Sequence, residues 1–490
     1  MLKILIEKEL KAIILSPKFS ATFSVCAILI VLSVFIGLRD YQAAVAQYET
    51  ATTLSNQEMR EQTSWMSLNT RAYREPDPMQ IFVAGVQNDV GRLSSINAFS
   101  QIKLENSNYS DEPIFAVFRF IDLTFIVQIV LSLFAILFTY DAINGEREGG
   151  TLQLTFANAV PRVQYILAKF IGSWLGLVLP LLIPLLIGLL LLLLFRVPMT
   201  GDHWAKLFTL IGASFLYFTF FIALGLLVSA LTKRSTTSFM FLLVAWVTLV
   251  LIVPRAGVML AGQITPVPTV AEIDGQREGY AKERWKQHMD ALTERWEERN
   301  AGLQNLTAEE REAFRDDHSW DWMKEDEEER KLVQRDISEY DRKLNEDLRN
   351  RKATQERLGF LLSRFSPASS YQLAAMHLAG TDISIKPEYE DAMRDYRDKF
   401  ISYREQKQKE EGGGMAGGFR IEFNSDTGMK ISGDRDSGAI DVTDVPVFEA
   451  PQHRFAAGLL PAMPDFGLLT LYTLLAFAAG FVAFLRYDVR

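Results

Sequence analysis

FIGSWLGLVLPLLIPLLIGLLLLLLF, residues 170–195, is a run of almost pure hydrocarbon without a charged side chain. A bilayer core of ~30 Å needs about 20 apolar residues of helix to cross it. Backbone polar groups inside a bilayer must be satisfied within a helix or a closed barrel, and a run that does not alternate excludes the barrel. The stretch therefore predicts a membrane-spanning helix.

Similar runs occur five more times in the 490-residue chain, at about residues 19–38, 118–140, 207–231, 238–253 and 466–485. The first run is not a signal peptide, because it has full length and no small-residue cleavage site follows it. The sequence therefore predicts an all-α polytopic membrane protein with six transmembrane helices.

Basic residues gather on one side of these runs. They are Lys3, Lys8, Lys11 and Lys18 before the first run, Arg147, Arg162 and Lys169 between the second and third, Lys233 and Arg234 between the fourth and fifth, and Arg486 and Arg490 after the last. The short loop on the other side has only Arg196 and Lys206. Since cytoplasmic loops carry the excess of Lys and Arg, both termini and the loop 141–169 are expected in the cytoplasm.

Two long segments, 39–117 and 254–465, are then expected on the periplasmic side. From Arg255 to Asp465 there are 31 Lys and Arg against 42 Asp and Glu, a net charge of −11 that exceeds the −9 of the whole chain. The remainder of the chain is therefore slightly positive, which suits a positive-inside membrane portion. The lone cysteine, Cys26, falls in the first run and forms no internal disulfide, so the acidic domain must be held by packing alone.

Three apolar stripes at 4-3-4 spacing predict a helical stalk in the second long segment, because such spacings are typical of short coiled coils. The stripes are Trp285, Met289, Leu292 and Trp296; Val333, Ile337, Tyr340, Leu344 and Leu348; and Tyr389, Met393, Tyr396, Phe400 and Tyr403. GGGMAGG, 412–418, is interpreted as a flexible joint, and FRIEF, MKIS and AIDVTDVPVF beyond it predict a small β-element.

Motifs for catalysis are lacking in the sequence. It has no GxxxxGK[ST] phosphate loop, no HExxH and no Cys pair, and its five histidines have no ligand spacing. We therefore expect no catalytic residue, no metal and no cofactor in this chain, although a site assembled from residues distant in sequence stays open.

Few ionisable groups fall within the apolar runs. Arg119 and Asp122 lie one turn apart at the outer mouth of the second run, as interfacial anchors or, alternatively, as a substrate contact. Pro180 and Pro184 kink the third run, either as a fixed bend or as a gate hinge. The lack of mid-membrane carboxylates and histidines favours a large or amphiphilic substrate, or no conduction at all.

The first 18 residues, MLKILIEKELKAIILSPK, predict a cytoplasmic amphipathic helix that lies in the membrane interface. Pro17, between Lys11 and Lys18, ends this helix and lets the chain turn into the bilayer. The alternative is a simple continuation of the first span.

The loop DAINGEREGGTLQLTFANAVPR, 141–162, interrupts two hydrocarbon runs. Gly149 and Gly150 permit a sharp turn, and Thr151 then caps a short helix that contains Leu152. Spacing alone leaves open whether this is an ordinary loop or a surface on which another protein pushes.

At this loop the chain resembles the permeases of the ABC-2 type exporter family. The resemblance rests on GEREGGTLQL at 145–154, the Pro161-Arg162 pair, Lys169, the start that ends in Ser16-Pro17-Lys18, and GLLVSALTKRSTTSFMFLLVAWVTLVLIVP at 225–254. SRFSPASSYQLAAMHLAGT, 363–381, adds a weaker match to members with a large outer insertion.

This resemblance implies a half-transporter whose ATP and Mg²⁺ are bound by a separate cytoplasmic ATPase subunit. It also implies a second permease copy, identical or related, and an inner-membrane location in a bacterium. Carried over to this chain, Glu146, Arg147, Glu148, Gly150, Thr151 and Leu152 would form the ATPase-coupling surface. The two long outer segments, however, far exceed a minimal family member.

The leading hypothesis is thus a permease subunit that exports a large or amphiphilic substrate. An alternative keeps this architecture but conducts nothing, and uses the stalk to act on a periplasmic partner. A third, a membrane-anchored enzyme or receptor without an ATPase, is the weakest. The sequence does not identify the substrate.

Overall fold

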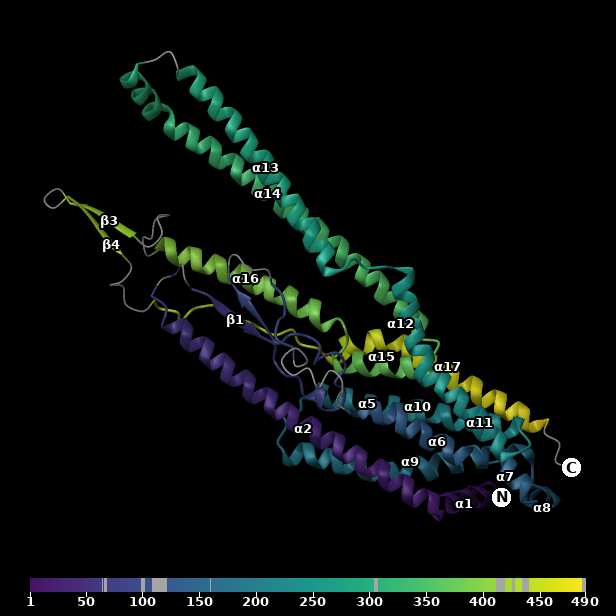
Figure 1. Cartoon of the computed structure of the whole chain (residues 1–490). Helices are drawn as coiled ribbons and strands as arrows, with labels where there is room; N and C mark the ends of the chain where they lie inside the picture. Colours follow the sequence, from purple (N-terminus) through teal and green to yellow (C-terminus); the bar gives the residue numbers. More distant parts are fainter. Residues whose placement is uncertain are drawn as a thin grey trace. The chain divides into compact units, whose positions relative to one another are not determined.

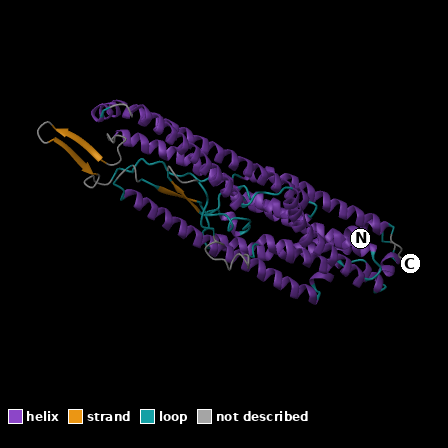
Figure 2. Cartoon of the chain, turned by 45° about the horizontal axis from the view of Figure 1, so that its top comes forward, coloured by secondary structure: helices purple, strands orange, loops and turns teal. Residues whose placement is uncertain are grey.

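The computed structural model divides the chain into two compact units, Met1–Ile252 with Ser366–Arg490, and Val253–Phe365. It describes residues 1–63, 65, 68–97, 102–107, 121–158, 160–303, 307–410, 419–424, 428–433 and 440–486. The predicted Gly-rich joint at 412–418 and Arg119 lie outside these residues. The chain is mostly helical, with two short antiparallel strand pairs among the described residues (Figure 2).

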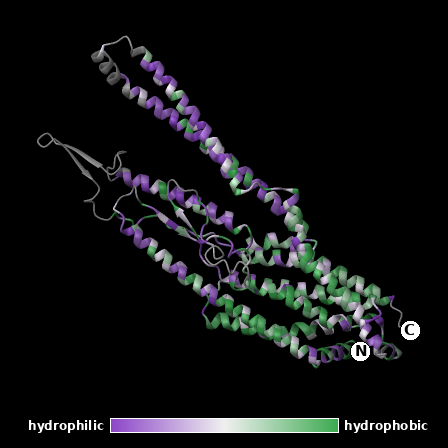
Figure 3. Ribbon diagram, in the orientation of Figure 1, coloured by the Kyte–Doolittle hydropathy of each residue, from purple (hydrophilic) through white to green (hydrophobic). Residues whose placement is uncertain are grey.

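Six helices are long and apolar enough to cross a membrane, which confirms the predicted fold class. They are Pro17–Arg60, Leu123–Glu148, Arg162–Leu194, Gly201–Leu231, Ser235–Ile264 and Phe455–Leu485. Figure 3 shows hydrophobic colouring along most of these helices, against the mainly polar colouring of the helices Val270–Leu303 and Ile385–Glu410. Each predicted run overlaps one of these helices, as expected for apolar segments of about 20 residues.

In chain order, the first unit begins with α1 (Leu2–Ile14), α2 (Pro17–Arg60), β1 (Thr70–Tyr73), η1 (Pro78–Ile81), β2 (Leu93–Ile96), α5 (Leu123–Phe125), η2 (Ile126–Leu131) and α6 (Ser132–Thr139). It continues with α7 (Asn144–Glu148), α8 (Thr151–Ala157), α9 (Arg162–Leu194), α10 (Gly201–Leu231), α11 (Ser235–Trp246) and η3 (Val247–Ile252). After the second unit come α15 (Pro367–Ala379), α16 (Ile385–Glu410), β3 (Phe419–Asn424), β4 (Gly428–Gly433) and α17 (Phe455–Leu485). Figure 1 labels most of these elements.

The helix of the first span does not end with its apolar run at residue 38. α2 continues to Arg60, because the polar stretch that follows contains neither proline nor glycine and is rich in helix-forming residues. The last span helix likewise begins at Phe455, well before residue 466, and contains Pro461 and Pro464.

α15 packs against span helices, although hydropathy placed it in a polar outer segment. Ten of its 13 residues are buried, and it contacts α10, α17, η2 and η3. Ser366 caps α15 by accepting a hydrogen bond from the Ala368 amide at 3.0 Å, and its hydroxyl donates to the carbonyl of Leu249 in η3. Small side chains permit this close packing among the spans.

The third predicted coiled-coil stripe has a different partner. In α16, Tyr389, Met393, Tyr396 and Phe400 are buried, but they share a core with Leu68, Ile96, Leu104 and other residues of the segment between the first two spans. β1 and β2 pair there with Thr70 opposite Ile96 and Tyr73 opposite Leu93. α16 therefore belongs to a small α/β subdomain of the first unit, and it does not extend the stalk.

The second unit comprises α12 (Val253–Ile264), α13 (Val270–Leu303) and α14 (Ala308–Ser363). α13 and α14 run side by side as an antiparallel hairpin (Figure 1), in which Arg277 pairs with Asp341 and Arg299 with Glu325. The predicted stripe on α14 faces inward, since Val333 is buried and Ile337, Tyr340, Leu344 and Leu348 are half-buried. The helical part of the stalk thus lies in residues 253–365 alone.

The predicted seam on α13 is wrong. Trp285, Met289 and Trp296 are 37%, 57% and 64% exposed, and of the four predicted residues only Leu292 is half-buried. The face turned towards α14 instead contains Ile273, Tyr280 and buried His288, and Tyr280 stacks on Tyr340 with ring centroids 4.0 Å apart. Arginine stems replace apolar side chains along much of this seam, with their charged ends paired to α14.

The small β-element is present as β3 and β4, which pair antiparallel from Phe419 opposite Gly433 to Asn424 opposite Gly428. The third predicted strand, AIDVTDVPVF, is not a strand over its described residues, 440–448. Val445 in this stretch packs instead into the core that contains α16.

Candidate functional site

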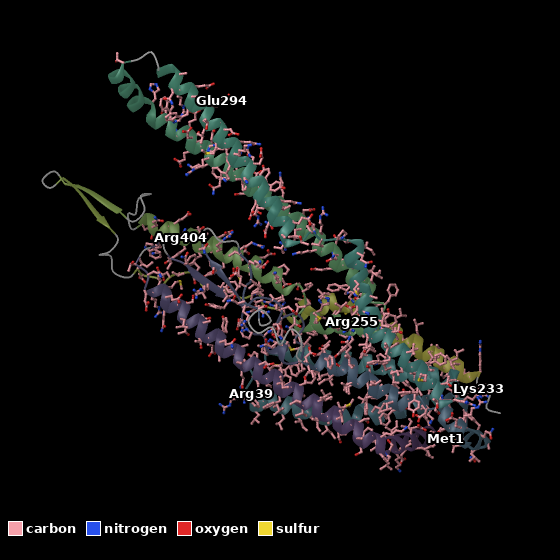
Figure 4. The ribbon with its side chains drawn as sticks, viewed as in Figure 1. Met1, Arg39, Lys233, Arg255, Glu294 and Arg404 are labelled. Carbon is pink, nitrogen blue, oxygen red and sulfur yellow. The ribbon has the colours of Figure 1, made fainter. Side chains whose placement is uncertain are left out.

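Both α7 and α8 lie at one end of the first unit, next to α1 and to the ends of α9, α10, α11 and α17. Met1 and Lys233 are labelled at this end, and Arg404 marks the opposite one (Figure 4). We call residues 141–158 the α7–α8 loop. The loop predicted to couple the spans to another protein is therefore in contact with several helix ends at once.

Asn144 fastens the start of α7 to the neighbouring spans. Its side chain is fully buried; Nδ2 donates to Thr232 Oγ1 at 3.0 Å, and Oδ1 accepts from Ser235 Oγ at 3.2 Å. Ser229 Oγ accepts the backbone N–H of Ile143 at 3.0 Å. Because buried polar groups that are fully hydrogen-bonded make a turn rigid, the loop is firmly joined to α10 and α11.

Glu146 is an internal anchor. Its carboxylate accepts hydrogen bonds from Lys8 Nζ at 2.8 Å, Lys169 Nζ at 2.9 Å and the Tyr165 hydroxyl at 2.6 Å. Lys169, which is 4% exposed, also pairs with Glu9 at 2.8 Å. This charge-assisted cluster ties α7 to α1 and α9.

The pKa of Lys8 is raised within this cluster. Burial alone would lower this pKa, but the hydrogen bond and charge of Glu146 raise it above its usual value. α1 also approaches α9 closely, because a Cβ added at Gly172 would lie 2.5 Å from Glu9 Cβ. The amphipathic helix is thus packed on the third span as well as presenting exposed Ile4.

Glu148 links α7 to the next loop on the same end. Its carboxylate accepts hydrogen bonds from the Ser235 backbone N–H at 3.0 Å and from Ser235 Oγ at 2.8 Å. A carboxylate at a helix N-terminus satisfies an otherwise unpaired amide and interacts favourably with the helix dipole. Glu148 therefore caps α11, the helix of the fifth span.

A left-handed glycine joins the two short helices. Gly150 has φ +70°, and a Cβ there would meet nothing within 4 Å, so the requirement for glycine is conformational. Leu152 follows and is fully buried with Ile143, Tyr165 and Phe484. Phe156 packs 5.3 Å from the ring of Tyr165, so one face of α8 is held against the spans.

The opposite face of α8 is exposed. Leu154 is 67% exposed, and Gln153, Ala157 and Asn158 are exposed beside it. At 100° per residue, Leu154 points almost directly away from Leu152 and Phe156. An apolar side chain is thus presented outward by a short helix whose inner face is anchored in the core.

Membership of a protein family gives this geometry its context. Residues 3–489 match the family described as ABC-2 family transporter protein. The chain belongs to the ABC-2 transporter family. Its members are the membrane-spanning subunits of ABC transporters, which implies a partner ATPase and a multi-pass membrane location. Among curated proteins, none matches the chain.

Within this ABC-2 protein, the six residues expected to form the coupling surface lie in different settings. Glu146 and Leu152 point inward and hold the loop, and Glu148 caps α11 from an exposed position. Gly150 and Thr151 are exposed, and Arg147 is half-buried. Glu146 and Leu152 therefore point inward in this structure, and the coupling role of the six residues stays a prediction.

The residues at the predicted N-terminal hinge lie where the helix breaks. α1 ends at Ile14, and α2 begins at Pro17 with Ser16 as its N-cap. Lys18 Nζ lies 3.2 Å from the Tyr140 hydroxyl and 3.8 Å from Asp141. Lys11 forms an exposed pair with Glu7 on α1.

The remaining candidate residues are the two prolines of the third span and Asp122 at the start of the second. Pro180 and Pro184 both lie inside α9, which continues through them from Arg162 to Leu194. Asp122 caps α5 by accepting the Phe125 amide at 2.8 Å, and its second oxygen accepts the Ala84 amide at 3.0 Å. Through these two bonds Asp122 joins the second span to the segment between the first two spans, and its role as an anchor or a substrate contact stays a prediction.

Sequence analysis named Lys8 and Lys169 only as cytoplasmic charges or as part of the family pattern. It missed that these two lysines, Tyr165 and Ser235 hold the loop. A signal was present for one of them. Lys169 stands at the entry of an apolar run, where an unpaired charge is costly, so a nearby carboxylate partner was to be expected.

Proposed function

We propose that this protein is the permease subunit of an ATP-driven exporter, and that the exposed face of α8 receives the motion of its ATPase partner. The observation that carries the proposal is Leu154, an exposed leucine on a helix whose other face is fixed in the core. A rigidly held apolar residue makes an effective contact point, since it loses little entropy on binding.

Motion received at α8 has direct routes into the spans. α8 packs on Tyr165 of α9 and Phe484 of α17, and α7 bonds to α10 and α11. Displacement of the loop therefore acts on four span helices together. We further propose that two permease copies pair in a bacterial inner membrane, with both termini and the α7–α8 loop in the cytoplasm, and that the cargo is large or amphiphilic.

Substitution of Leu154 tests the coupling role. The permease is reconstituted with the ATPase subunit encoded beside it, and stimulation of ATP hydrolysis is measured. We expect L154A to weaken association of the ATPase about five- to thirtyfold, as for loss of 1–2 kcal/mol at a central contact. Leu231, 66% exposed at the end of α10, supplies the control variant L231A. Equal stimulation by the two variants would refute the proposal.

One observation favours a second function, in which the ATPase drives the stalk against a partner protein. The outward face of α13 presents Trp285, Met289 and Trp296, and exposed aromatic residues are enriched at protein interfaces. The α13–α14 hairpin is also long, since 34 residues of α13 extend about 50 Å.

Truncation of the hairpin separates the two functions. Replacement of residues 285–335 by a short Gly-Ser linker removes the aromatic face but keeps the Arg277–Asp341 pair at the base. Deletion as far as residue 411 would be uninformative, because it would also remove α15 and α16 from the first unit. An exporter keeps substrate flux after truncation, whereas a lever keeps stimulated ATP hydrolysis but loses its effect on the partner.

A further inference from the structure

A cavity of about 610 Å³ lies between α2 and the polar segment that contains β1 and η1. Its volume is within the range of about 300–1,000 Å³ typical of small-molecule sites. The α2 wall runs from Ser33 and Gly37 in the apolar run to Ala51 in the polar extension, about 27 Å along the helix. The cavity therefore spans the boundary at which the first span leaves its apolar run.

Arg74 gives this cavity an uncompensated positive charge. Its Nη2 donates to the carbonyl of Gln87 at 2.8 Å, whereas Nη1 is buried without a hydrogen-bond partner. Within the described part of the chain, no carboxylate lies within ion-pair distance of it. Burial lowers the pKa of Arg74 to about 10, so the guanidinium remains protonated at neutral pH. A buried, unpaired charge is costly, and an anionic ligand would remove that cost.

A second unsatisfied donor lines the same cavity. Gln80 Oε1 accepts a hydrogen bond from Gln87 Nε2, but Gln80 Nε2 is buried without a partner. The other arginine of the wall, Arg92, is already occupied, since Nη1 donates to Gln47 and Nε to the carbonyl of Asn106. Arg74 and Gln80 are thus residues of the cavity wall that each carry a buried, unpaired donor.

Carboxylates on the same walls supply negative charge. Asp40 and Glu75 both line the cavity, and neither pairs with Arg74. The third carboxylate, Asp122, is occupied by the backbone amides of Ala84 and Phe125. A ligand with one anionic and one cationic group matches this mixed wall better than a simple anion, which the two acids would repel.

The end of the cavity nearest the apolar run is hydrophobic. Ile36 on α2 and Ile121 before α5 line it and are 37% and 48% exposed. Arg39 and Asp40 follow the apolar run immediately, and Arg39 marks this level in Figure 4. Polar head groups lie at this depth of a bilayer, with acyl chains beside the apolar run.

We propose that the cavity binds a zwitterionic phospholipid, a phosphate linked to a primary amine on two acyl chains. Arg74 and Gln80 hold the phosphate, Asp40 and Glu75 face the ammonium group, and an acyl chain lies along Ile36 and Ile121. This site is distinct from the α7–α8 loop and does not depend on the proposed export function.

Lipid binding to the full-length protein tests the site. The purified chain is stripped of lipid in detergent and titrated with phosphatidylethanolamine, phosphatidylglycerol or soluble phosphoethanolamine, and bound ligand is counted by native mass spectrometry. We expect phosphatidylethanolamine to bind most tightly. Equal binding of phosphatidylglycerol would overturn the role of the carboxylates, and equal binding of phosphoethanolamine would overturn the lipid assignment.

Two arginines in neighbouring positions provide matched variants. R74Q should weaken phosphatidylethanolamine binding about ten- to hundredfold, as for loss of a charged hydrogen bond. R71Q should bind like the wild type, because Arg71 is exposed on β1 and faces Glu58. Equal binding by R74Q and R71Q would overturn the proposal. Lipid-free R74Q should unfold no earlier than wild type, since an unpaired buried charge has been removed.

Two further measurements test the proposal if R74Q fails to fold or if the cavity holds something other than lipid. The double variant D40N/E75Q should lose the preference for phosphatidylethanolamine over phosphatidylglycerol. A photo-cross-linker at Gln87 should capture lipid. Its reaction with residues 108–120, which join the wall residues Asn106 and Ile121, would show that the chain fills its own cavity and would overturn the proposal.

Discussion

The carboxylate of Glu146 lies 2.9 Å from the Nζ of Lys169, and this pair joins the α7–α8 loop to the third span. The same carboxylate holds Lys8 of α1. An acid that the family resemblance assigned to the coupling surface is therefore bonded to residues within the protein. Exposure and anchoring are divided between nearby residues of the loop, with Leu154 exposed and Glu146 directed inward.

Removal of the Glu146 charge should destabilise the protein. In E146Q the carboxylate that satisfies Lys8, Lys169 and Tyr165 is lost, and a hydrogen bond to a charged group contributes about 1.5–3 kcal/mol. We expect a lower midpoint of thermal unfolding in detergent and faster proteolysis of the N-terminal helix.

Glu7 on α1 provides the control for this variant. It forms an exposed pair with Lys11 at 2.8 Å, and exposed pairs contribute little. E7Q should therefore unfold with the wild-type midpoint. If E146Q is as stable as E7Q, the cluster does not hold the loop.

Close packing of α10 on α6 depends on Gly225. A Cβ at this position would lie 1.8 Å from Thr139 Oγ1, a buried atom that donates to the carbonyl of Ala135. Overpacking typically costs about 1–3 kcal/mol, so G225A should unfold at a lower temperature. Gly212 on the same helix has nothing within 4 Å of its added Cβ, and G212A should be neutral or slightly stabilising. Equal midpoints of the two variants would contradict this packing.

Ser366 should contribute to stability through α15. S366A removes the N-cap bonds to Ala368 and Ser369 and leaves the carbonyl of Leu249 without this donor. Loss of a serine cap costs about 0.5–2 kcal/mol. Ser402, exposed on α16 with a local bond to the Asp398 carbonyl, gives the control variant S402A. A wild-type unfolding midpoint for S366A would mean that α15 is held by apolar packing alone.

Hydropathy and charge asymmetry were sufficient to predict the six spans, because a run of about 20 apolar residues has few other solutions. They were not sufficient to predict that α15 packs against the span helices, because its stretch is too short to span a bilayer. A signal was nevertheless present, since no Asp, Glu, Lys or Arg occurs between Ser366 and Gly380 in an otherwise acidic segment.

The site was predictable in position but not in orientation. GEREGGTLQL marked the α7–α8 loop, yet the inward direction of Glu146 depends on Lys8 and Lys169, which are 138 and 23 residues away in the sequence. On α13 the apolar spacing indicated the wrong face, because arginine–carboxylate pairs such as Arg284–Asp336 form much of the seam. The sequence alone could not assign the partners of Glu146 or the face of α13 that contacts α14.

Acid should remove the contribution of Asp382 to the stability of the folded protein. Burial alone would raise the pKa of this carboxyl, but hydrogen bonds from His377 at 2.5 Å and from the Ser384 amide at 2.7 Å lower it below the usual 3.8. Because the folded-state pKa lies below 3.8, the ionised carboxyl stabilises the folded protein at pH values above 3.8. That stabilisation is lost as the pH falls through the folded-state pKa.

The variant D382N should therefore unfold earlier than wild type at neutral pH, and the difference should shrink below pH 3.8. D398N is the control, because the Asp398 side chain is 73% exposed. A D382N difference that stays constant through acid pH would show that the carboxylate charge does not stabilise this turn.

The outward aromatic face of α13 should contribute to partner contact and not to stability. W296A should leave the unfolding midpoint within the small range usual for surface changes, about ±0.5 kcal/mol, because Trp296 is 64% exposed. V333A should lower it, since Val333 is 5% exposed in the opposing helix. Were the stripe a folding seam, W296A would be the more damaging change. A W296A protein that folds normally and stimulates its ATPase, but fails in the cell, favours the lever function, whereas normal activity in the cell favours simple export.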